Sequence, residues 1–198
     1  MQLRLSLWSV VLIVFSLSSV RAVPVPVPSA PTDTPRLPLG PPVEEWITQE
    51  LLAYQTGLSV EEVRAVAGVI EEESAQHGLG RELVLAVMQT ESAFYNWARS
   101  RAGALGLMQI MPATGEMLAR QLEIPWGGPE TLFDPIINVR LGVAYLAHLH
   151  ARYGTWSPAL AAYNWGPGAI DRRLRRGHGI PVAYTTRIFA ALAAPTLP

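Results

Sequence analysis

The sequence predicts an all-α fold, and three observations support this prediction. From Val43 onward apolar residues recur at helical spacing, and no alternating strand pattern of useful length appears. Four prolines stand near the start of an expected helix, where a missing N–H costs least: Pro112, Pro135, Pro158 and Pro181. Nearly half of the residues (49%) are hydrophobic, so the chain can form a hydrophobic core. A length of 198 residues is enough for one domain and short for two.

The first 42 residues are expected to precede this domain. Arg4 comes before a mostly apolar run over residues 5–17, and Val20-Arg21-Ala22 fits a cleavage site, so residues 1–22 predict a signal peptide. An uncleaved N-terminal anchor is the alternative. Residues 23–42 are rich in proline and predict an extended linker. We therefore expect an exported protein, periplasmic, cell-envelope or secreted, with no stable membrane insertion after cleavage.

Eight helices are expected after this linker. The first contains Trp46, and Ser59 with Glu62 gives a capping-box start for the second, which runs towards Gln76. The third covers residues 81–92. The others are expected over residues 112–122, 135–152, 157–164, 168–176 and 181–193. Residues 43–65 are interpreted as an N-terminal helical extension and residues 66–198 as the main domain.

Composition excludes several classes of function. The formal net charge is −1, which gives no strong field for nucleic acid. The chain has no cysteine, so a thiolate nucleophile and a Cys-ligated metal are excluded. The four histidines form no compact cluster with acidic residues at ligand spacing. No metal site and no cofactor are expected.

Glu91 is the candidate catalytic residue. In the third helix Val84, Val87 and Met88 share one face, and Glu91 is the next position on that apolar stripe. Burial disfavours the ionised carboxylate and raises its pKa, as general-acid cleavage of a glycosidic bond requires. The alternative is that Glu91 turns to solvent at the helix end.

The residues that follow Glu91 favour a sugar-binding site. Phe94, Tyr95 and Trp97 form an aromatic cluster, which could also be ordinary core packing. Gly103 and Gly106 then indicate a tight turn of the backbone, a close approach of another group to the backbone, or both. Gln109 offers an amide donor and acceptor suited to an N-acetyl or hydroxyl group.

Four segments together resemble the soluble lytic transglycosylase family of peptidoglycan-cleaving enzymes. They are Glu91-Ser92-Ala93-Phe94, the Gly-Ala-Leu-Gly-Leu-Met-Gln-Ile-Met-Pro segment over 103–112, the segment from Phe133-Asp134-Pro135 to Tyr145-Leu146, and Ala-Tyr-Asn-Trp-Gly-Pro-Gly over 162–168. The resemblance runs from about Val66 to Ala190 and implies a lysozyme-like catalytic domain without a cofactor.

The resemblance also implies roles for matching positions. Glu91 matches the catalytic acid/base. Ser100 and Gln109 match polar cleft residues near the reacting sugar, and Met108 matches an apolar cleft contact. The Tyr163-Asn164 pair is expected near the catalytic carboxyl. Tyr184 matches a later tyrosine of the cleft, although the segment that precedes it is shorter than in the family pattern. Trp165 stands where the family usually has a small residue, and it is expected to change the shape of one sugar subsite.

The sequence favours a one-carboxylate mechanism. Two-carboxylate glycosidases need a second acid across the bond, but Glu116 lies inside an expected helix and Asp134 is expected to cap one. We therefore expect a peptidoglycan lytic transglycosylase that cleaves between N-acetylmuramic acid (MurNAc) and N-acetylglucosamine (GlcNAc) and leaves a 1,6-anhydro-MurNAc end. The alternatives are a lysozyme-type hydrolase and a non-catalytic glycan-binding or secretion-associated protein. Expected partners are peptidoglycan strands and an assembly for secretion or division, but not nucleic acid.

Two charged runs have a simple interpretation as solvated helix faces. One is Glu71-Glu72-Glu73. The other is the run of Arg172, Arg173, Arg175 and Arg176, for which attraction of peptide-stem carboxylates or an anionic wall polymer is the alternative.

Overall fold

The structure is a computed structural model that describes residues 43–193. Within these residues the chain forms helices and no strands, and two isolated bridges (Arg99–Leu105 and Leu105–Ile110) hold the loop over residues 93–111. The all-α prediction is confirmed for this part of the chain. The expected signal peptide and linker lie outside the described residues.

The expected helices are present, and wherever a helix end was predicted, the observed end lies within two residues of it. They are α1 (Val43–Leu52), α2 (Val60–His77), α3 (Arg81–Ser92), α4 (Pro112–Gln121), α5 (Pro135–Tyr153), α6 (Trp156–Trp165), α7 (Pro167–Arg175) and α8 (Ala183–Ala193). A 3₁₀ turn, η1 (Pro129–Phe133), was not predicted. None of the helices in this part of the chain is both long and apolar enough to span a bilayer.

Local capping explains several of these helix ends. Ser59 accepts a hydrogen bond from the Glu62 N–H while the Glu62 carboxylate accepts one from the Ser59 N–H, so the predicted capping box is confirmed. Gly78 ends α2 in the left-handed region. Asp134 accepts from the first N–H groups of α5, as expected of a cap.

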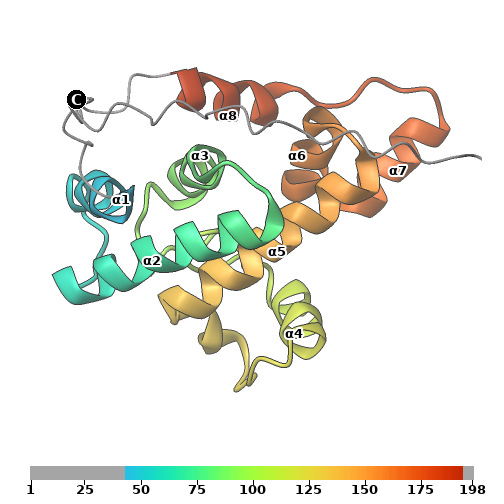
Figure 1. Cartoon of the computed structure of the whole chain (residues 1–198). Coiled ribbons are helices and arrows are strands. Elements are labelled where there is room, and N and C mark those ends of the chain that lie inside the picture. Colours follow the sequence, from blue (N-terminus) through green and yellow to red (C-terminus); the bar gives the residue numbers. More distant parts are fainter. Residues whose placement is uncertain (1–42, 194–198) are drawn as a thin grey trace, which may run out of the picture. The chain divides into compact units, whose positions relative to one another are not determined.

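Helix α3 lies at the centre of the packing. Six consecutive residues, 83–88, are buried on all sides, and α3 packs against α2 and α8 (Figure 1). Helix α5 packs against α2 and α6, and α1 also packs against α2. Residues 43–65 therefore share a core with the rest, because Ile47 and Leu51 of α1 are buried in it. The proposed boundary at residue 66 stays a prediction.

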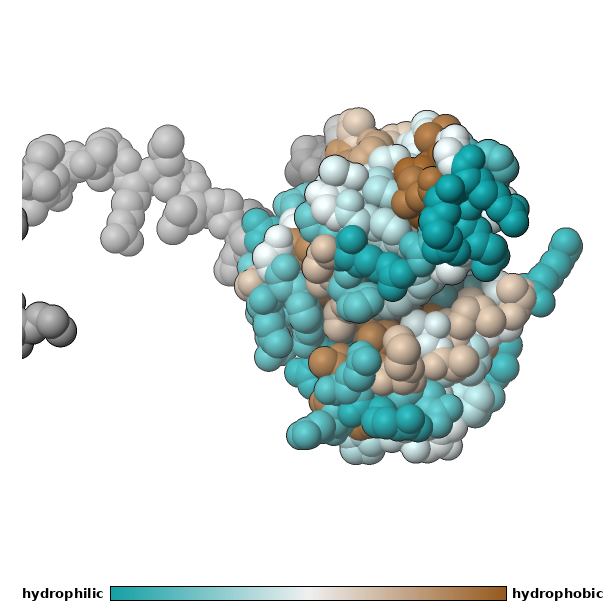
Figure 2. Space-filling model, turned by 90° about the vertical axis from the view of Figure 1, so that its right-hand side faces the viewer, coloured by the Kyte–Doolittle hydropathy of each residue, from teal (hydrophilic) through white to brown (hydrophobic). Residues whose placement is uncertain are grey.

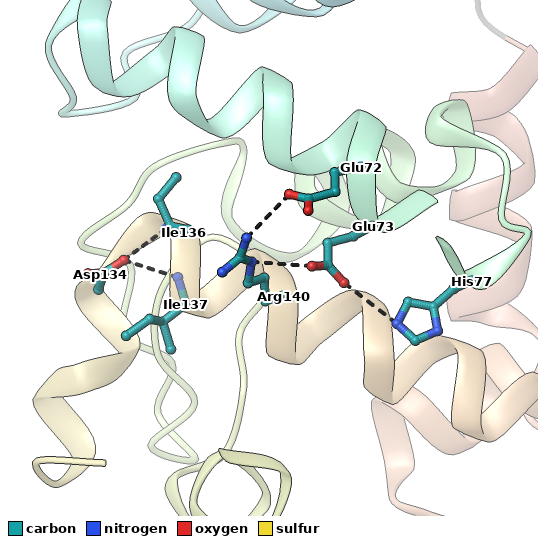
Figure 3. A network of polar contacts seen from close by, with 7 residues as sticks. All are labelled: Glu72, Glu73, His77, Asp134, Ile136, Ile137 and Arg140. Carbon is teal, nitrogen blue, oxygen red and sulfur yellow. Dashed lines mark hydrogen bonds and ion pairs between the residues drawn. The ribbon is translucent and has the colours of Figure 1, made fainter. Parts of the chain in front are cut away.

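An ion network ties α2 to α5 and corrects the expectation for the acidic run (Figure 3). Glu72 is exposed as predicted, and it pairs with Arg140 at 3.2 Å. Glu73 is buried, with 8% of its surface exposed, which contradicts the prediction of a solvated residue. It packs between α2 and α5, where it pairs with Arg140 at 3.2 Å and with His77 at 3.6 Å.

Candidate active site

Glu91 occupies the last turn of α3 and is half-buried. The hydroxyl of Tyr184, a buried residue of α8, donates a hydrogen bond of 2.6 Å to its Oε1. The packing of α8 against α3 creates this contact. Glu91 therefore does not simply turn to solvent, and one of its two oxygens has a phenol partner.

The surroundings of Glu91 favour its protonated form. Burial raises the pKa of Glu91 above the ordinary value of 4.5, while the Tyr184 hydrogen bond and the positive charge of Arg187 act in the opposite direction. Burial and the negative charge of Glu91 also raise the pKa of Tyr184 and of Tyr163. Both phenols thus stay neutral hydrogen-bond donors beside the carboxyl group.

The chain turns sharply after Glu91, and this turn fixes the end of α3. Ala93 and Phe94 have φ values of 50° and 63°, in the left-handed region. Phe94 is buried and packs edge-on against Tyr54, with ring centroids 4.6 Å apart. The Ser92 hydroxyl hydrogen-bonds the carbonyls of Met88 and Leu107 at 3.1 and 2.7 Å. Glu91 is thereby held against the following loop.

The glycine-rich loop is shaped by Asn138 of α5. This buried amide donates to the carbonyls of Leu105 and Leu132 and accepts from the Met108 N–H at 2.8 Å. Gly106 has a φ of 79°, and a Cβ there would overlap the Asn138 amide and a backbone carbonyl. The glycine is required by this close approach as well as by its backbone conformation.

The expected role of the Met108 side chain is wrong. It is fully buried because it packs against Gly142 of α5, where a Cβ would collide with it. Its carbonyl, however, accepts a hydrogen bond of 2.9 Å from the Tyr163 hydroxyl. Met108 therefore supports the site through its backbone and does not expose a surface to a sugar.

A pocket of about 270 Å³ lies beside Tyr163. It is lined by Gln109, Ile110, Met111, Thr114, Tyr145, Tyr163, Asn164, Trp165, Gly166 and Pro167. Three of the expected site residues therefore share one pocket. Glu91 does not line it. The negative charge of Glu91 raises the pKa of the Tyr163 hydroxyl, which indicates that the carboxyl group lies near this side of the pocket.

Gln109 and Ser100 are both tied into the loop. The Gln109 NH₂ group donates to the carbonyls of Ala98 and Gly106 at 3.0 and 2.9 Å, which leaves its Oε1 to accept from a ligand. Ser100 is exposed, and its Oγ accepts from the Ala104 N–H at 2.9 Å. Ser100 lies outside the residues that line the pocket.

The other carboxylates considered from the sequence have structural partners. Glu116 pairs with Arg120 within α4 at 3.2 Å, and Asp134 caps α5. In residues 43–193 no three His, Asp or Glu side chains gather closely enough to hold a metal ion.

Sequence reasoning assigned no role in the site to Arg187, Tyr145 or Thr114. Arg187 lies one turn after Tyr184 on α8, and its guanidinium carbon is 5.8 Å from the centre of the Tyr184 ring. The i, i+3 spacing was a usable signal for it. Tyr145 packs on Tyr163 at 5.4 Å between ring centres, and Thr114 lines the pocket.

Comparison with known families agrees with this geometry. The profile of the Transglycosylase SLT domain matches residues 68–179, which is more than half of the chain. The chain belongs to the transglycosylase SLT domain family. The matched range contains Glu91, the glycine-rich loop and the Tyr163-Asn164 pair, whereas Tyr184 lies just beyond it. The expected resemblance is confirmed.

Relatives of this SLT-domain protein include larger enzymes. It is 39% identical over 119 residues to membrane-bound lytic murein transglycosylase C of Sodalis glossinidius, covering 55% of this chain and 33% of that protein. With the protein of the same name from Cronobacter sakazakii it is 38% identical over 115 residues, 53% and 32% of the two chains. The chain thus spans about a third of the length of these relatives.

Solved structures confirm the lysozyme-like fold of this SLT-domain protein. An inactive mutant of lytic transglycosylase Slt from Pseudomonas aeruginosa is 33% identical, with a TM-score of 0.51, over 61% of this chain and 20% of that one. A complex of the 70-kDa soluble lytic transglycosylase with bulgecin A is 26% identical, with a TM-score of 0.55, over 74% and 26%.

Proposed function

We propose that this chain is a peptidoglycan lytic transglycosylase that cleaves the β-1,4 bond between MurNAc and GlcNAc and leaves a 1,6-anhydro-MurNAc end. The observation that carries the proposal is the Glu91 carboxyl group, which is half-buried, held by Tyr184 and next to the pocket residue Tyr163. Membership of the SLT family supports the same activity.

In this mechanism Glu91 serves as acid and then as base. Protonated Glu91 gives its proton to the oxygen that links MurNAc to GlcNAc, and the C1–O bond breaks. The acetamido group of MurNAc stabilises the cation at C1. The ionised Glu91 then removes the proton from the C6 hydroxyl as that oxygen bonds to C1. The carboxyl group ends protonated, and no water is consumed.

In this mechanism Tyr184 orients the Glu91 carboxyl group and stabilises its ionised form. Its hydroxyl occupies Oε1 of Glu91, so Oε2 is the oxygen that exchanges a proton with the substrate. A phenol donor stabilises the carboxylate more than the acid, and it therefore helps Glu91 to release its proton in the first step. Arg187 acts in the same direction through its charge.

The pocket beside Tyr163 is the proposed sugar site. The Gln109 Oε1 accepts from an N–H or hydroxyl, the exposed Asn164 amide offers both donor and acceptor, and the exposed ring of Trp165 provides a flat stacking face. Tyr163 holds the loop by its bond to the Met108 carbonyl. Ser100, which is exposed on the same loop, is the proposed contact for a part of the glycan strand outside this pocket.

The protein is further proposed to work in the cell envelope after export. The relatives reported above are named membrane-bound, and a murein substrate lies outside the inner membrane. Peptidoglycan strands are the proposed partner, and a secretion or division assembly is a second one.

Two other functions make different predictions from the same site. A lysozyme-type hydrolase would place a water at C1 and produce reducing ends, but the candidate second carboxylates are engaged elsewhere. A non-catalytic peptidoglycan-binding protein would not need a carboxyl group at Glu91.

Replacement of Glu91 by Gln tests the proposal. Gln keeps the shape and accepts the Tyr184 hydrogen bond, but it cannot transfer a proton. We expect release of soluble fragments from purified peptidoglycan to fall at least about 1,000-fold, with an unchanged helical circular dichroism spectrum. Gln49→Glu, at an exposed position of α1, is a control that should leave the rate unchanged. Full activity of Glu91→Gln would overturn the assignment.

A further inference from the structure

A second pocket shares Trp165 with the first, and its lining is strongly basic. It has a volume of about 220 Å³ and is lined by Trp165, Ala169, Arg172, Arg173, Arg176 and His178. Figure 2 shows the side of the molecule that carries α7, where a group of hydrophilic residues lies above a groove bordered by less polar residues. No acidic side chain lines this pocket.

The local fold brings these basic groups to one place. The chain turns back after α7 at Gly177, which has a φ of 66°, and the His178 N–H donates to the Arg173 carbonyl at 2.9 Å. The Arg173 Nε in turn donates to the Gly179 carbonyl at 2.8 Å, which holds this guanidinium in place. Three arginines and one histidine therefore line one hollow.

The acidic residue of α7 does not neutralise them. Asp171 pairs with Arg152 at 2.6 Å and accepts a hydrogen bond of 2.8 Å from the Tyr153 hydroxyl of α5. Within the described residues, Arg172, Arg173 and Arg176 take part in no ion pair. The pocket thus has an uncompensated positive charge, which favours an anion.

We propose that this basic pocket binds the carboxylates of the peptide stems of peptidoglycan. Guanidinium groups bind planar carboxylates in a bidentate manner, and the exposed indole of Trp165, 57% accessible, provides an apolar wall for the peptide. The inference rests on the proposed function, because the stem hangs from the lactyl group of the MurNAc unit whose bond is cleaved.

The position of Trp165 favours a stem over a separate anionic polymer. This residue lines both the proposed sugar pocket and the basic pocket, so the two are neighbours on one surface. A ligand that fills both must carry a sugar and an anionic group on the same molecule. A stem-bearing muramic unit has this composition, whereas a phosphate polymer of the wall fills only the basic pocket.

Arg175 provides a matched control for Arg176. The two residues are neighbours at the end of α7 and are both exposed, but only Arg176 lines the pocket. Arg176→Gln and Arg175→Gln remove the same charge from the same helix end. A general attraction of the helix for anions would respond equally to both changes, whereas a defined pocket responds only to the first.

The test is a binding measurement on the protein that carries Glu91→Gln, so that no substrate is consumed. Affinities for a MurNAc-GlcNAc saccharide with and without its stem peptide are compared by calorimetry. We expect the stem to increase affinity about tenfold or more, and Arg172→Gln and Arg176→Gln to abolish this gain while Arg175→Gln keeps it. Raising NaCl from about 50 to about 500 mM should weaken the gain, because salt screens exposed charges.

Three results would overturn the proposal: no gain from the stem, an equal loss in the Arg175 and Arg176 variants, or binding of a wall phosphate polymer at this pocket without a stem effect. Because binding is measured in the Glu91→Gln background, a failure of the stem site is distinguishable from a failure of the proposed activity. The latter would appear as absence of cleavage by the unsubstituted protein even if stem-dependent binding remains.

Discussion

The Tyr184 hydroxyl lies 2.6 Å from Oε1 of Glu91, across 93 positions of sequence. This contact joins the last helix to the candidate acid/base and lowers the pKa of Glu91, against the larger effect of burial, which raises it. The balance of these two influences sets the pH at which the proposed general acid is protonated. Removal of the Tyr184 hydroxyl group changes this balance.

Tyr184→Phe should therefore shift the pH profile of cleavage. Loss of the phenol donor raises the pKa of Glu91, so the decline of kcat/KM on the alkaline side moves to higher pH. The maximal rate should fall roughly 10- to 100-fold, as expected for a charge-assisted hydrogen bond of about 1.5–3 kcal/mol. An unshifted profile with a lower rate would mean that Tyr184 only fills space.

Glu91→Gln should stabilise the fold at neutral pH. Because the folded pKa of Glu91 is raised, its contribution to stability is fully present below the unfolded value of 4.5 and is lost as pH rises through the folded pKa. A neutral amide has no such loss. The thermal midpoint of the variant should exceed that of the original protein by a few degrees at about pH 7, with the difference vanishing near about pH 4. A difference that is independent of pH would contradict the raised pKa.

Gly106→Ala should destabilise the protein much more than Gly103→Ala. Both glycines have positive φ, but only at Gly106 would a Cβ overlap Asn138 and the Leu132 carbonyl, whereas Gly103 has nothing within 4 Å. We expect losses of about 3 kcal/mol or more and about 1 kcal/mol in chemical denaturation. Equal losses would mean that backbone conformation alone explains the Gly106 requirement.

Arg140→Met should destabilise the protein, because it leaves the buried Glu73 carboxylate without its arginine partner. Burial raises the pKa of Glu73, while Arg140 and His77 oppose this, so removal of the guanidinium raises that pKa further. The loss of stability should be roughly 2 kcal/mol at about pH 7, less than for a fully buried pair because Arg140 is 40% exposed.

The same sign argument as for Glu91 makes this loss small near about pH 4. Arg120→Met, which breaks the exposed pair with Glu116, is the control and should cost less than about 0.5 kcal/mol. Similar losses for the two arginines would rule out a special role for the Glu73 network.

Local signals made most of the helices predictable. The capping box of Ser59 and Glu62, the cap at Asp134 and the prolines at the starts of α4 and α5 act on neighbouring residues, so the sequence alone reveals them. The apolar stripe on α3 also identified Glu91. The exposure of Glu73 was predicted wrongly, because its charge matched its neighbours and its partner Arg140 lies on another helix.

Tertiary contacts explain what the sequence could not reveal about the site. The Met108 side chain is buried because Gly142, on a helix that follows later, leaves space for it. The bond from Tyr184 to Glu91 depends on how α8 packs against α3. The segment before Tyr184 is shorter than in the family pattern, so the sequence alone did not establish that Tyr184 matches the family's cleft tyrosine. The packing of the helices brings the Tyr184 hydroxyl to the Glu91 carboxylate.

Mass spectrometry of the soluble products tests the central proposal most directly. The protein is incubated with purified peptidoglycan, and the ends of the released muropeptides are identified, with Glu91→Gln as the control that should release none. We predict muropeptides that end in 1,6-anhydro-MurNAc, as a single carboxyl group that serves as acid and base requires. Reducing MurNAc ends would contradict this account and would make the protein a hydrolase with a water-activating group that we have not assigned.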